Sequence, residues 1–250
     1  MSDFFILSFL LLGGFVTGLI NSIAGGGGLI SIPLLISIGI PINFILGTNK
    51  LQATIGSFTA STFHISKKIV NVKKIIPGII FTALGAIIGA TSVQFISSKI
   101  LDYLIPILLF AVLTFTFIKP KFGLSDSVPK ISENIFYIFF GLSFGFYDGF
   151  FGPGVGSFWT ISFSYFLGYN FSKATSHTSV LNFVSNFIAL IIFLIGGKVL
   201  FFHGIVMGVG QFIGSKIGAK LVFTKGAKFV KPIFILMVFV TIVRLILKNQ

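Results

Sequence analysis

Asp148 is the residue of this 250-residue chain whose type and surroundings most strongly indicate chemistry. It lies inside an apolar stretch, whereas the other four acids lie at the N-terminus, in a polar segment or at the start of an apolar run. An acid within a membrane-spanning segment is costly, so it is a functional candidate by default. Two interpretations stay open: Asp148 carries a coupling proton, or its side chain caps a helix that begins near Gly152.

Two polar triplets, at residues 48–50 and 175–177, begin what we expect to be equivalent helices. Lys50 and His177 could each pair with an oxyanion, and a histidine can also titrate near neutral pH. Lys50 could instead extend its ammonium group to a membrane surface. His64 and His203 lie near the ends of apolar runs, so we expect both at that surface.

Carboxamide side chains accompany the triplets. Gln52 follows the first triplet, while Asn182 and Asn186 follow the second at a spacing that places them on one helix face. They could contribute to a binding site or form hydrogen bonds between helices.

Glycine-rich breaks interrupt two long apolar runs, AGGGG at residues 24–28 and FGPGVG at residues 151–156. Glycine at this density disfavours a helix, and Pro153 lacks a backbone donor. Irregular backbone inside a membrane persists only where it is buried in protein or lines a cavity. Close helix packing is the alternative explanation, and we assign that role to the Gly14/Gly18 and Gly141/Gly145 pairs.

Matched helix breaks are a sequence indication of a transporter's binding site. The helix that follows each break would present N–H groups and the positive end of its dipole, which favours an anion. Ser31 and Ser157 follow the breaks and could add hydroxyl donors. The residues expected to contact the anion are Asn21, Gly25, Gly26, Gly27, Gly28, Ser31, Thr48, Asn49, Lys50, Gln52, Gly152, Gly154, Gly156, Ser157, Thr175, Ser176, His177, Asn182 and Asn186.

Several kinds of site are disfavoured. The absence of Cys excludes disulfides, thiolate zinc sites and a Cys nucleophile. Three scattered His and one acid within a span make a poor metal site. We find no Ser/His/Asp arrangement with suitable spacing, and no Gly-Lys-Ser/Thr follows the glycines. We therefore expect no metal, no cofactor and no enzymatic activity.

The composition is that of a membrane protein. Hydrophobic residues make up 55% of the chain and charged residues 9%, and the mean hydropathy is +1.07. Soluble domains carry about 25% charged residues. The net charge of +13 is accompanied by no nucleic-acid motif, so we expect no nucleic-acid partner. The uncharged stretch near the N-terminus is too long for a signal peptide.

The chain divides into two similar halves. Residues 119–134 form a polar linker between repeats at residues 1–118 and 135–250, and each half has one double-length apolar run followed by three single runs. An offset of 127 residues superposes Gly14 on Gly141, Gly25 on Gly152 and Asn21 on Asp148. We infer an all-α polytopic membrane protein built from two repeats of about five segments each.

The distribution of lysines indicates that the second repeat is inverted, because cytoplasmic loops collect Lys and Arg. Segments 67–74, 119–134, 169–177 and 216–231 hold thirteen of the eighteen basic residues. They share one side if each double run crosses the membrane twice or forms a hairpin. We expect ten crossings and external termini.

The stretches GGFVTGLINSIAGGGGLISIPLL, LGTNKLQATIGSF, GFYDGFFGPGVGSF and GQFIGSKIGAK resemble the sulfite exporter TauE/SafE family, and most closely its YfcA-like branch. The resemblance covers nearly the whole chain. It implies a multi-pass transporter of the bacterial inner membrane whose relatives move sulfite, thiosulfate or organosulfonates. The Gly-Pro-Gly-Val-Gly of the second break and the nearby Asp148 depart from the broader family pattern and are typical of that branch.

We therefore expect a secondary transporter of a small anion that works by alternating access, with a proton as the first candidate for the coupling ion. A passive anion channel and a membrane scaffold or assembly factor are the alternatives. The expected partners are the anion and membrane lipid, and a homo-oligomer stays open.

Overall fold

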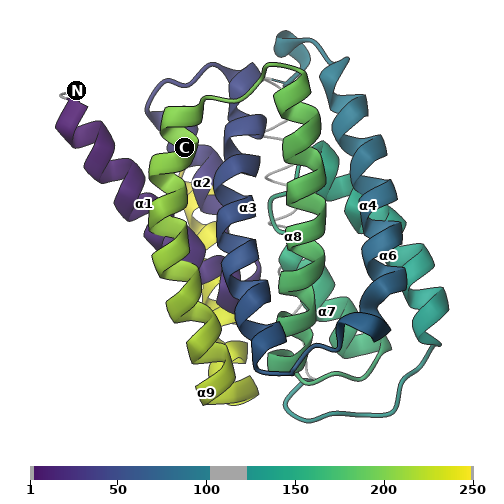
Figure 1. The fold of residues 1–250 in the computed structure, drawn as a ribbon. Coiled ribbons are helices and arrows are strands. Elements are labelled where there is room, and N and C mark those ends of the chain that lie inside the picture. Colours follow the sequence, from purple (N-terminus) through teal and green to yellow (C-terminus); the bar gives the residue numbers. More distant parts are fainter. Residues whose placement is uncertain (1–2, 102–122, 249–250) are drawn as a thin grey trace.

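The computed structural model describes residues 3–101 and 123–248, and the elements it forms there are all helices (Figure 1). The predicted all-α fold is thus confirmed for this part of the chain, while Asp102 and residues 119–122 of the linker lie outside it. The helices are α1 (Asp3–Ala24), α2 (Gly28–Ser37), α3 (Ile42–Ser66), α4 (Val72–Gln94), α6 (Glu133–Phe150), α7 (Val155–Phe166), α8 (Phe171–Ile195) and α9 (Phe201–Lys248).

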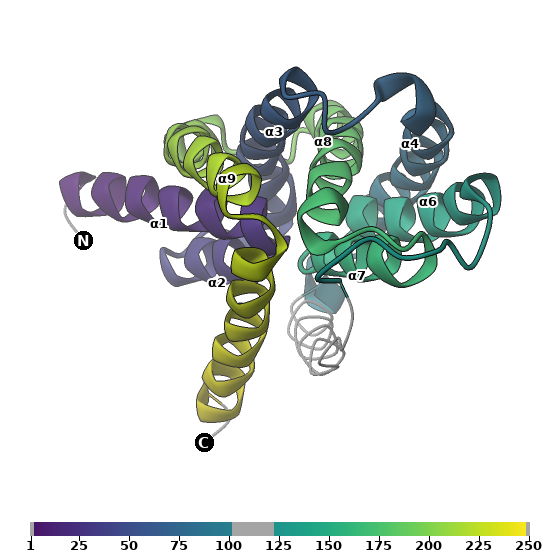
Figure 2. The ribbon, with the colours of Figure 1, turned by 90° about the horizontal axis from the view of Figure 1, so that it is seen from below.

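Local chemistry explains several helix boundaries. The side chain of Asn71 accepts a hydrogen bond from the Lys73 N–H at the start of α4, over 3.1 Å. Asn170 does the same for the Lys173 N–H at the start of α8, over 3.0 Å. These caps satisfy donors that have no partner inside the helix. Gly226 interrupts α9 with a left-handed φ of 66°, and the helix beyond it leaves the bundle (Figure 2).

Each double-length run forms a hairpin of one long and one short helix. α2 has 10 residues and α7 has 12, so they are about 15 and 18 Å long. A crossing needs about 20 residues. Of the two alternatives for each double run, the described helices fit a hairpin and do not fit two full crossings.

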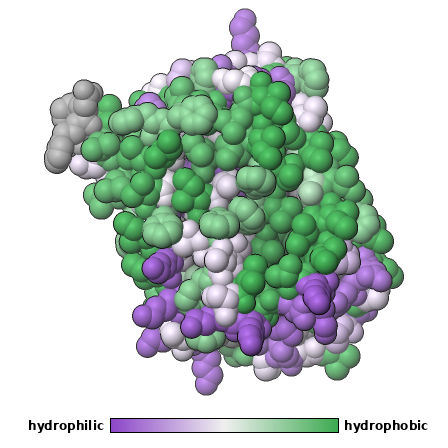
Figure 3. All heavy atoms as spheres, in the orientation of Figure 1, coloured by the Kyte–Doolittle hydropathy of each residue, from purple (hydrophilic) through white to green (hydrophobic). Residues whose placement is uncertain are grey.

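Four of the described helices are long and apolar enough to cross a membrane: Ile6–Ala24, Val72–Gln94, Phe171–Ile195 and Phe201–Gly226. α3 has 25 residues but is too polar for this group, because it carries many of the candidate site residues. Large apolar side chains are exposed on the outside of the bundle, and Figure 3 shows them as a broad hydrophobic region above a hydrophilic lower end. An exposed apolar surface of this size fits lipid.

The helices are arranged around a central pair. α3 and α8 contact each other, α1 and α9 pack together on one side, and α4 and α6 pack together on the other (Figures 1 and 2). The main contacts of the two halves of the chain correspond: α1 with α9 matches α6 with α4, and α3 with α9 matches α8 with α4. The first described helix of each half thus packs on the last described helix of the other half.

Glycines allow the outer pairs to approach closely, as expected for the GxxxG motifs. A methyl group added to Gly14 in α1 would overlap the Met207 carbonyl of α9. One added to Gly145 in α6 would overlap the Thr82 carbonyl of α4. The packing role assigned to these motifs is confirmed at both positions.

The basic segments share one end of the bundle, as their charge pattern predicts. The Ser127 N–H of the linker donates to the Gly168 carbonyl over 2.7 Å, and the Ser172 hydroxyl of α8 donates to the Val222 carbonyl of α9 over 3.0 Å. Figure 1 shows the α3–α4 loop at this same end. At the opposite end, Lys198 Nζ donates to the Gln94 carbonyl over 3.1 Å.

Asp126 fastens the described part of the linker to α8. Its Oδ1 accepts hydrogen bonds of 2.8 Å from the backbone N–H and the side chain of Asn170, and its Oδ2 lies 3.5 Å from Lys173 Nζ. Partial burial acts to raise the pKa of Asp126, but the hydrogen bonds from Asn170 and the charge of Lys173 outweigh it, so the pKa lies below its ordinary value. This ion pair is exposed and contributes little to folding.

The membrane orientation of the two ends stays a prediction that cysteine labelling can test. The chain has no Cys, so Lys74→Cys and Lys99→Cys each introduce a unique thiol at an exposed position. On intact cells, an impermeant maleimide is expected to label Lys99→Cys at once and Lys74→Cys only after permeabilisation. Equal labelling of both from outside would contradict the arrangement.

Candidate functional site

The two glycine breaks meet in the interior of the bundle. Gly25 has a left-handed φ of 69°, and a Cβ atom built on it would lie 2.5 Å from the Cα atom of Gly156. Ser157 Oγ donates to the Ala24 carbonyl over 2.9 Å, which links the second break to the first. Gly152 has a φ of 106°, a conformation that other residues rarely adopt. Glycine is therefore required here for backbone conformation and for close approach.

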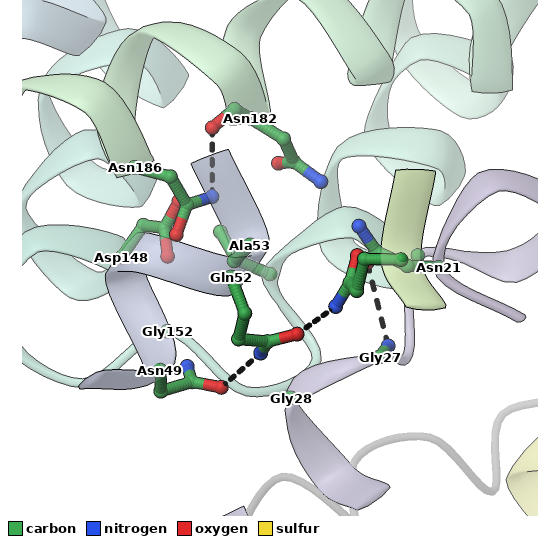
Figure 4. A pocket seen from close by; sticks show the side chains of 13 residues that line it. Asn21, Gly27, Gly28, Asn49, Gln52, Ala53, Asp148, Gly152, Asn182 and Asn186 are labelled. Carbon is green, nitrogen blue, oxygen red and sulfur yellow. Dashed lines mark hydrogen bonds between the residues drawn. The ribbon is translucent and has the colours of Figure 1, made fainter. Parts of the chain in front are cut away.

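A small polar cavity of about 20 Å³ lies between the breaks and helices α3, α8 and α9 (Figure 4). This volume holds about one water molecule. Residues that line the cavity are Asn21, Gly25, Gly27, Gly28, Asn49, Gln52, Ala53, Asp148, Gly152, Val155, Asn182, Asn186 and Gln211.

One wall of the cavity is a chain of hydrogen-bonded carboxamides. Gln211 Nε2 of α9 donates to Gln52 Oε1 of α3, and Gln52 Nε2 donates to Asn49 Oδ1 over 2.6 Å (Figure 4). Ser31 Oγ of α2 donates to the same Asn49 oxygen over 2.5 Å. These hydrogen bonds therefore connect the two halves of the protein through neutral groups that can donate and accept.

The facing wall carries two asparagines from α8. Asn186 Nδ2 donates to the Asn182 carbonyl over 2.7 Å. In Figure 4 the carboxamide of Asn182 points across the cavity toward Asn21, whose Oδ1 accepts a 3.4 Å hydrogen bond from the Gly27 N–H. The cavity thus has carboxamides on opposite walls, which suits a small ligand with several acceptor atoms.

Lys50 and Asp148 form a buried ion pair beside the cavity. Lys50 Nζ lies 2.6 Å from Asp148 Oδ1, and the two side chains are only 1% and 2% exposed. The same ammonium group donates to the Asp148 carbonyl and, over 3.2 Å, to Asn186 Oδ1. All three N–H groups of the lysine therefore have acceptors.

The second carboxylate oxygen of Asp148 is also occupied. Its Oδ2 accepts hydrogen bonds from Ser185 Oγ and, over 3.3 Å, from Asn186 Nδ2. The predicted capping role of Asp148 is wrong, because Gly154 is the N-cap residue of α7 and receives no side-chain cap. The alternative that Lys50 reaches a membrane surface is wrong as well, because its ammonium group is buried in this ion pair.

The sequence model of the family described as "Sulfite exporter TauE/SafE" matches residues 10–245. The chain belongs to this family. Two relatives, described as "Probable membrane transporter protein ORF9" from Sinorhizobium sp and "Probable membrane transporter protein" from Haemophilus influenzae, are each 39% identical. The matches cover 97% and 96% of this chain, and 93% and 94% of those proteins.

A third relative, "Probable membrane transporter protein YfcA" from Escherichia coli strain K12, is 39% identical over 94% of this chain and 89% of its own length. No solved structure matches the chain. This TauE/SafE protein is therefore a multi-pass membrane transporter, consistent with a place in the inner membrane.

In this TauE/SafE protein the first break and the first triplet contribute more to the cavity than their counterparts do. The predicted residues that line it are Asn21, Gly25, Gly27, Gly28, Asn49, Gln52, Gly152, Asn182 and Asn186, together with Asp148. Predicted residues that do not line it are Gly26, Ser31, Thr48, Lys50, Gly154, Gly156, Ser157, Thr175, Ser176 and His177.

The second triplet lies near the basic end instead of at the cavity. His177 Nδ1 contacts the Lys173 carbonyl over 2.9 Å, and its ring packs against Tyr169 with a centroid distance of 4.9 Å. Ser176 Oγ bonds to His64 Nδ1 over 3.1 Å. The second triplet therefore does not lie at the cavity: it begins α8 at the end of the bundle, far along the helix from Asn186.

His64 is fully buried, so its predicted place at the membrane surface is wrong. It lies in the last turn of α3, where α3 packs against the start of α8. A position near a helix end does not imply exposure when a neighbouring helix covers that end.

Several other predicted residues that do not line the cavity contact neighbouring parts of the protein instead. Thr48 Oγ1 accepts a hydrogen bond from the Leu200 N–H, over 3.0 Å, just before α9. A Cβ atom built on Gly26 would have no neighbour closer than 4.0 Å outside the adjacent residues. Ser31 contacts two residues that line the cavity, Asn49 and the carbonyl of Gly27. Ser157, like Gly156, joins the two breaks to each other.

Gln211 and Ser185 are the polar residues at the site that the sequence interpretation missed. Gln211 is 1% exposed and Ser185 is fully buried. A glutamine in an otherwise apolar run was an available signal, since polar residues in spans tend to be functional. Ser185 precedes Asn186, and nothing in its own sequence context separates it from the other serines.

Proposed function

We propose that this protein is a secondary transporter that moves a small anion, of the sulfur oxyanion or organosulfonate class, by alternating access. The anion binds in the cavity between the two glycine breaks. The single observation that carries the proposal is the meeting of both broken hairpins at one polar cavity in a chain of the TauE/SafE family.

The chemistry of the cavity walls supports an anion. Short helices α2 and α7 begin at the breaks, so the positive ends of their dipoles lie at the cavity. Carboxamide N–H groups can donate to oxyanion oxygens without a fixed charge. The sulfur-containing class rests on the family to which the chain belongs.

The small volume supports alternating access over a passive channel. A cavity with room for about one water cannot hold sulfite or a sulfonate without movement of its walls. The hairpins that form two of these walls are interrupted at glycines, where backbone rotation is least hindered. We infer that binding requires the short helices to move, as in a carrier.

Uptake of radiolabelled sulfite and thiosulfate into proteoliposomes tests the proposal. Saturable uptake is expected for the wild-type protein. Gln52→Leu should lower uptake at limiting substrate about 10- to 100-fold, because a hydrogen bond to a charged group is worth about 1.5–3 kcal/mol. Gln94→Leu is the matched control, because Gln94 lies at the end of α4 away from the cavity.

The outcomes separate the alternatives. Flux that rises linearly with concentration would favour a channel. An intact, inserted protein with no flux of any sulfur-containing anion would contradict the proposed substrate class. That result would favour the alternative of a membrane scaffold.

A further inference from the structure

The two partners of the Lys50–Asp148 ion pair differ in their relation to the cavity. Asp148 lines the cavity, whereas Lys50 does not, although their charged groups are 2.6 Å apart. Lys50 is the one cation whose contacts place it next to this cavity in the described part of the chain. An anion in the cavity therefore meets the carboxylate before it meets the lysine.

The position of the carboxylate next to the cavity matters because of its charge. Two ionised groups out of water are tolerated only while they neutralise each other. An anion added beside the ionised pair would give the site a net negative charge and face the carboxylate directly. The same anion would be neutralised by Lys50 if the carboxylate were protonated.

We propose, building on the anion transport proposed above, that the anion and Asp148 compete for Lys50, so that each anion enters the site together with one proton. The proton is taken from water by a carboxylate oxygen of Asp148. The anion then accepts the hydrogen bond from Lys50 Nζ that the carboxylate gives up. Lys50 keeps its own proton throughout, so a monoanion binds with no change in the net charge of the site.

The groups around Asp148 leave few other proton acceptors. α3 contributes Lys50, and α8 contributes the neutral Ser185 and Asn186. α4 packs on this part of α6 through Ala86 and Ala90, beside Gly149. The neighbouring Tyr147 on α6 donates its hydroxyl to the Pro153 carbonyl over 2.7 Å. Asp148 is thus the carboxyl group at this site.

Gly152 connects the ion pair to the movable hairpin. A Cβ atom built on Gly152 would lie 2.6 Å from Asp148 Oδ1 and 2.7 Å from Lys50 Nζ. The backbone that begins the second break therefore rests on the ion pair. Separation of the two charges requires this backbone to shift, which links proton uptake to the movement of α7.

Calorimetric titration of the purified full-length protein tests the inference. The probes are methanesulfonate and thiosulfate, which carry no titrating group near neutral pH. Two amine buffers with different heats of ionisation report the protons taken up, and sulfonate buffers are avoided because they belong to the proposed substrate class. We expect about one proton per methanesulfonate and an affinity that falls about tenfold per pH unit once Asp148 is ionised in the free protein.

Variants identify the proton acceptor. Asp148→Asn is expected to bind the probe with no proton uptake and with a flat pH dependence. Asp126→Asn, which removes the exposed acid of the linker, should behave like the wild type. If Asp148→Asn does not fold, the proton uptake of the wild-type protein and the pH dependence of its affinity for the probe still test the inference.

Binding by the wild-type protein without proton uptake would overturn the inference and leave the proposed function intact. Proton uptake that persists in Asp148→Asn would overturn it too. Failure of the well-folded wild-type protein to bind either probe would instead contradict the proposed substrate class, and the inference would fall with it.

Discussion

Lys50→Met is expected to destabilise the protein by about 3–5 kcal/mol and to abolish anion uptake. The substitution keeps most of the side-chain volume but leaves Asp148 as an unpaired charge in the interior, and the loss of one partner of a buried pair has this cost. Thermal unfolding in detergent, together with uptake by the folded fraction, measures both effects.

A double variant separates stability from transport. Lys50→Met combined with Asp148→Asn removes both charges, so much of the lost stability should return while uptake stays absent. Lys173→Met is the surface control, since its partner Asp126 is exposed and such pairs are worth about 0–1 kcal/mol. A Lys50→Met protein as stable as the wild type would show that the buried pair is not formed.

Gly25→Ala is expected to abolish transport, whereas Gly26→Ala should retain it. At Gly25 a side chain must adopt a left-handed φ of 69° and would lie 2.5 Å from the Cα atom of Gly156. The left-handed conformation costs about 1–2 kcal/mol, and overlap with a packed backbone adds about 1–3 kcal/mol. The breaks can no longer meet if this contact is forced apart.

Gly26→Ala changes the next residue by the same methyl group. The nearest atom to a Cβ at Gly26 is 4.0 Å away, so we expect a change in stability within about 0.5 kcal/mol and normal uptake. Equal loss of transport in both variants would mean that glycine flexibility throughout the break, and not its contact with the second break, is what matters.

Much of the fold could be predicted from local sequence signals. The glycine breaks, the polar linker and the clustering of basic segments depend on composition over short stretches, and the structure has the breaks and the shared basic end where the sequence places them. The lengths of α2 and α7 were harder to predict, because an uninterrupted apolar stretch does not reveal where a short helix ends.

The site could be predicted only in part, because the two halves of the chain do not contribute equally to the cavity. Transfer of the role of residues 48–50 to residues 175–177 assumed that matched positions occupy matched places. Asn49 faces the cavity, but its counterpart Ser176 bonds to His64 near the basic end. The pairing of Lys50 with Asp148 joins residues 98 apart in sequence, and no local pattern indicates it.

The ion pair also explains why two hypotheses about single residues were wrong. Lys50 considered alone fits a surface lysine, and Asp148 considered alone fits a helix cap. Each charge is tolerated in the interior because the other is present, and only the three-dimensional contacts of Lys50 with Asp148 and Asn186 reveal this.

The central claim is that the anion occupies the cavity between the glycine breaks, and crystals grown with selenite test it most directly. Selenium replaces the sulfur of sulfite and gives an anomalous signal that locates the ion. We predict a peak between the two breaks, within hydrogen-bonding reach of the Gln52 and Asn182 side chains. Selenium found only among the lysines of the basic end, with none in the cavity, would contradict the account.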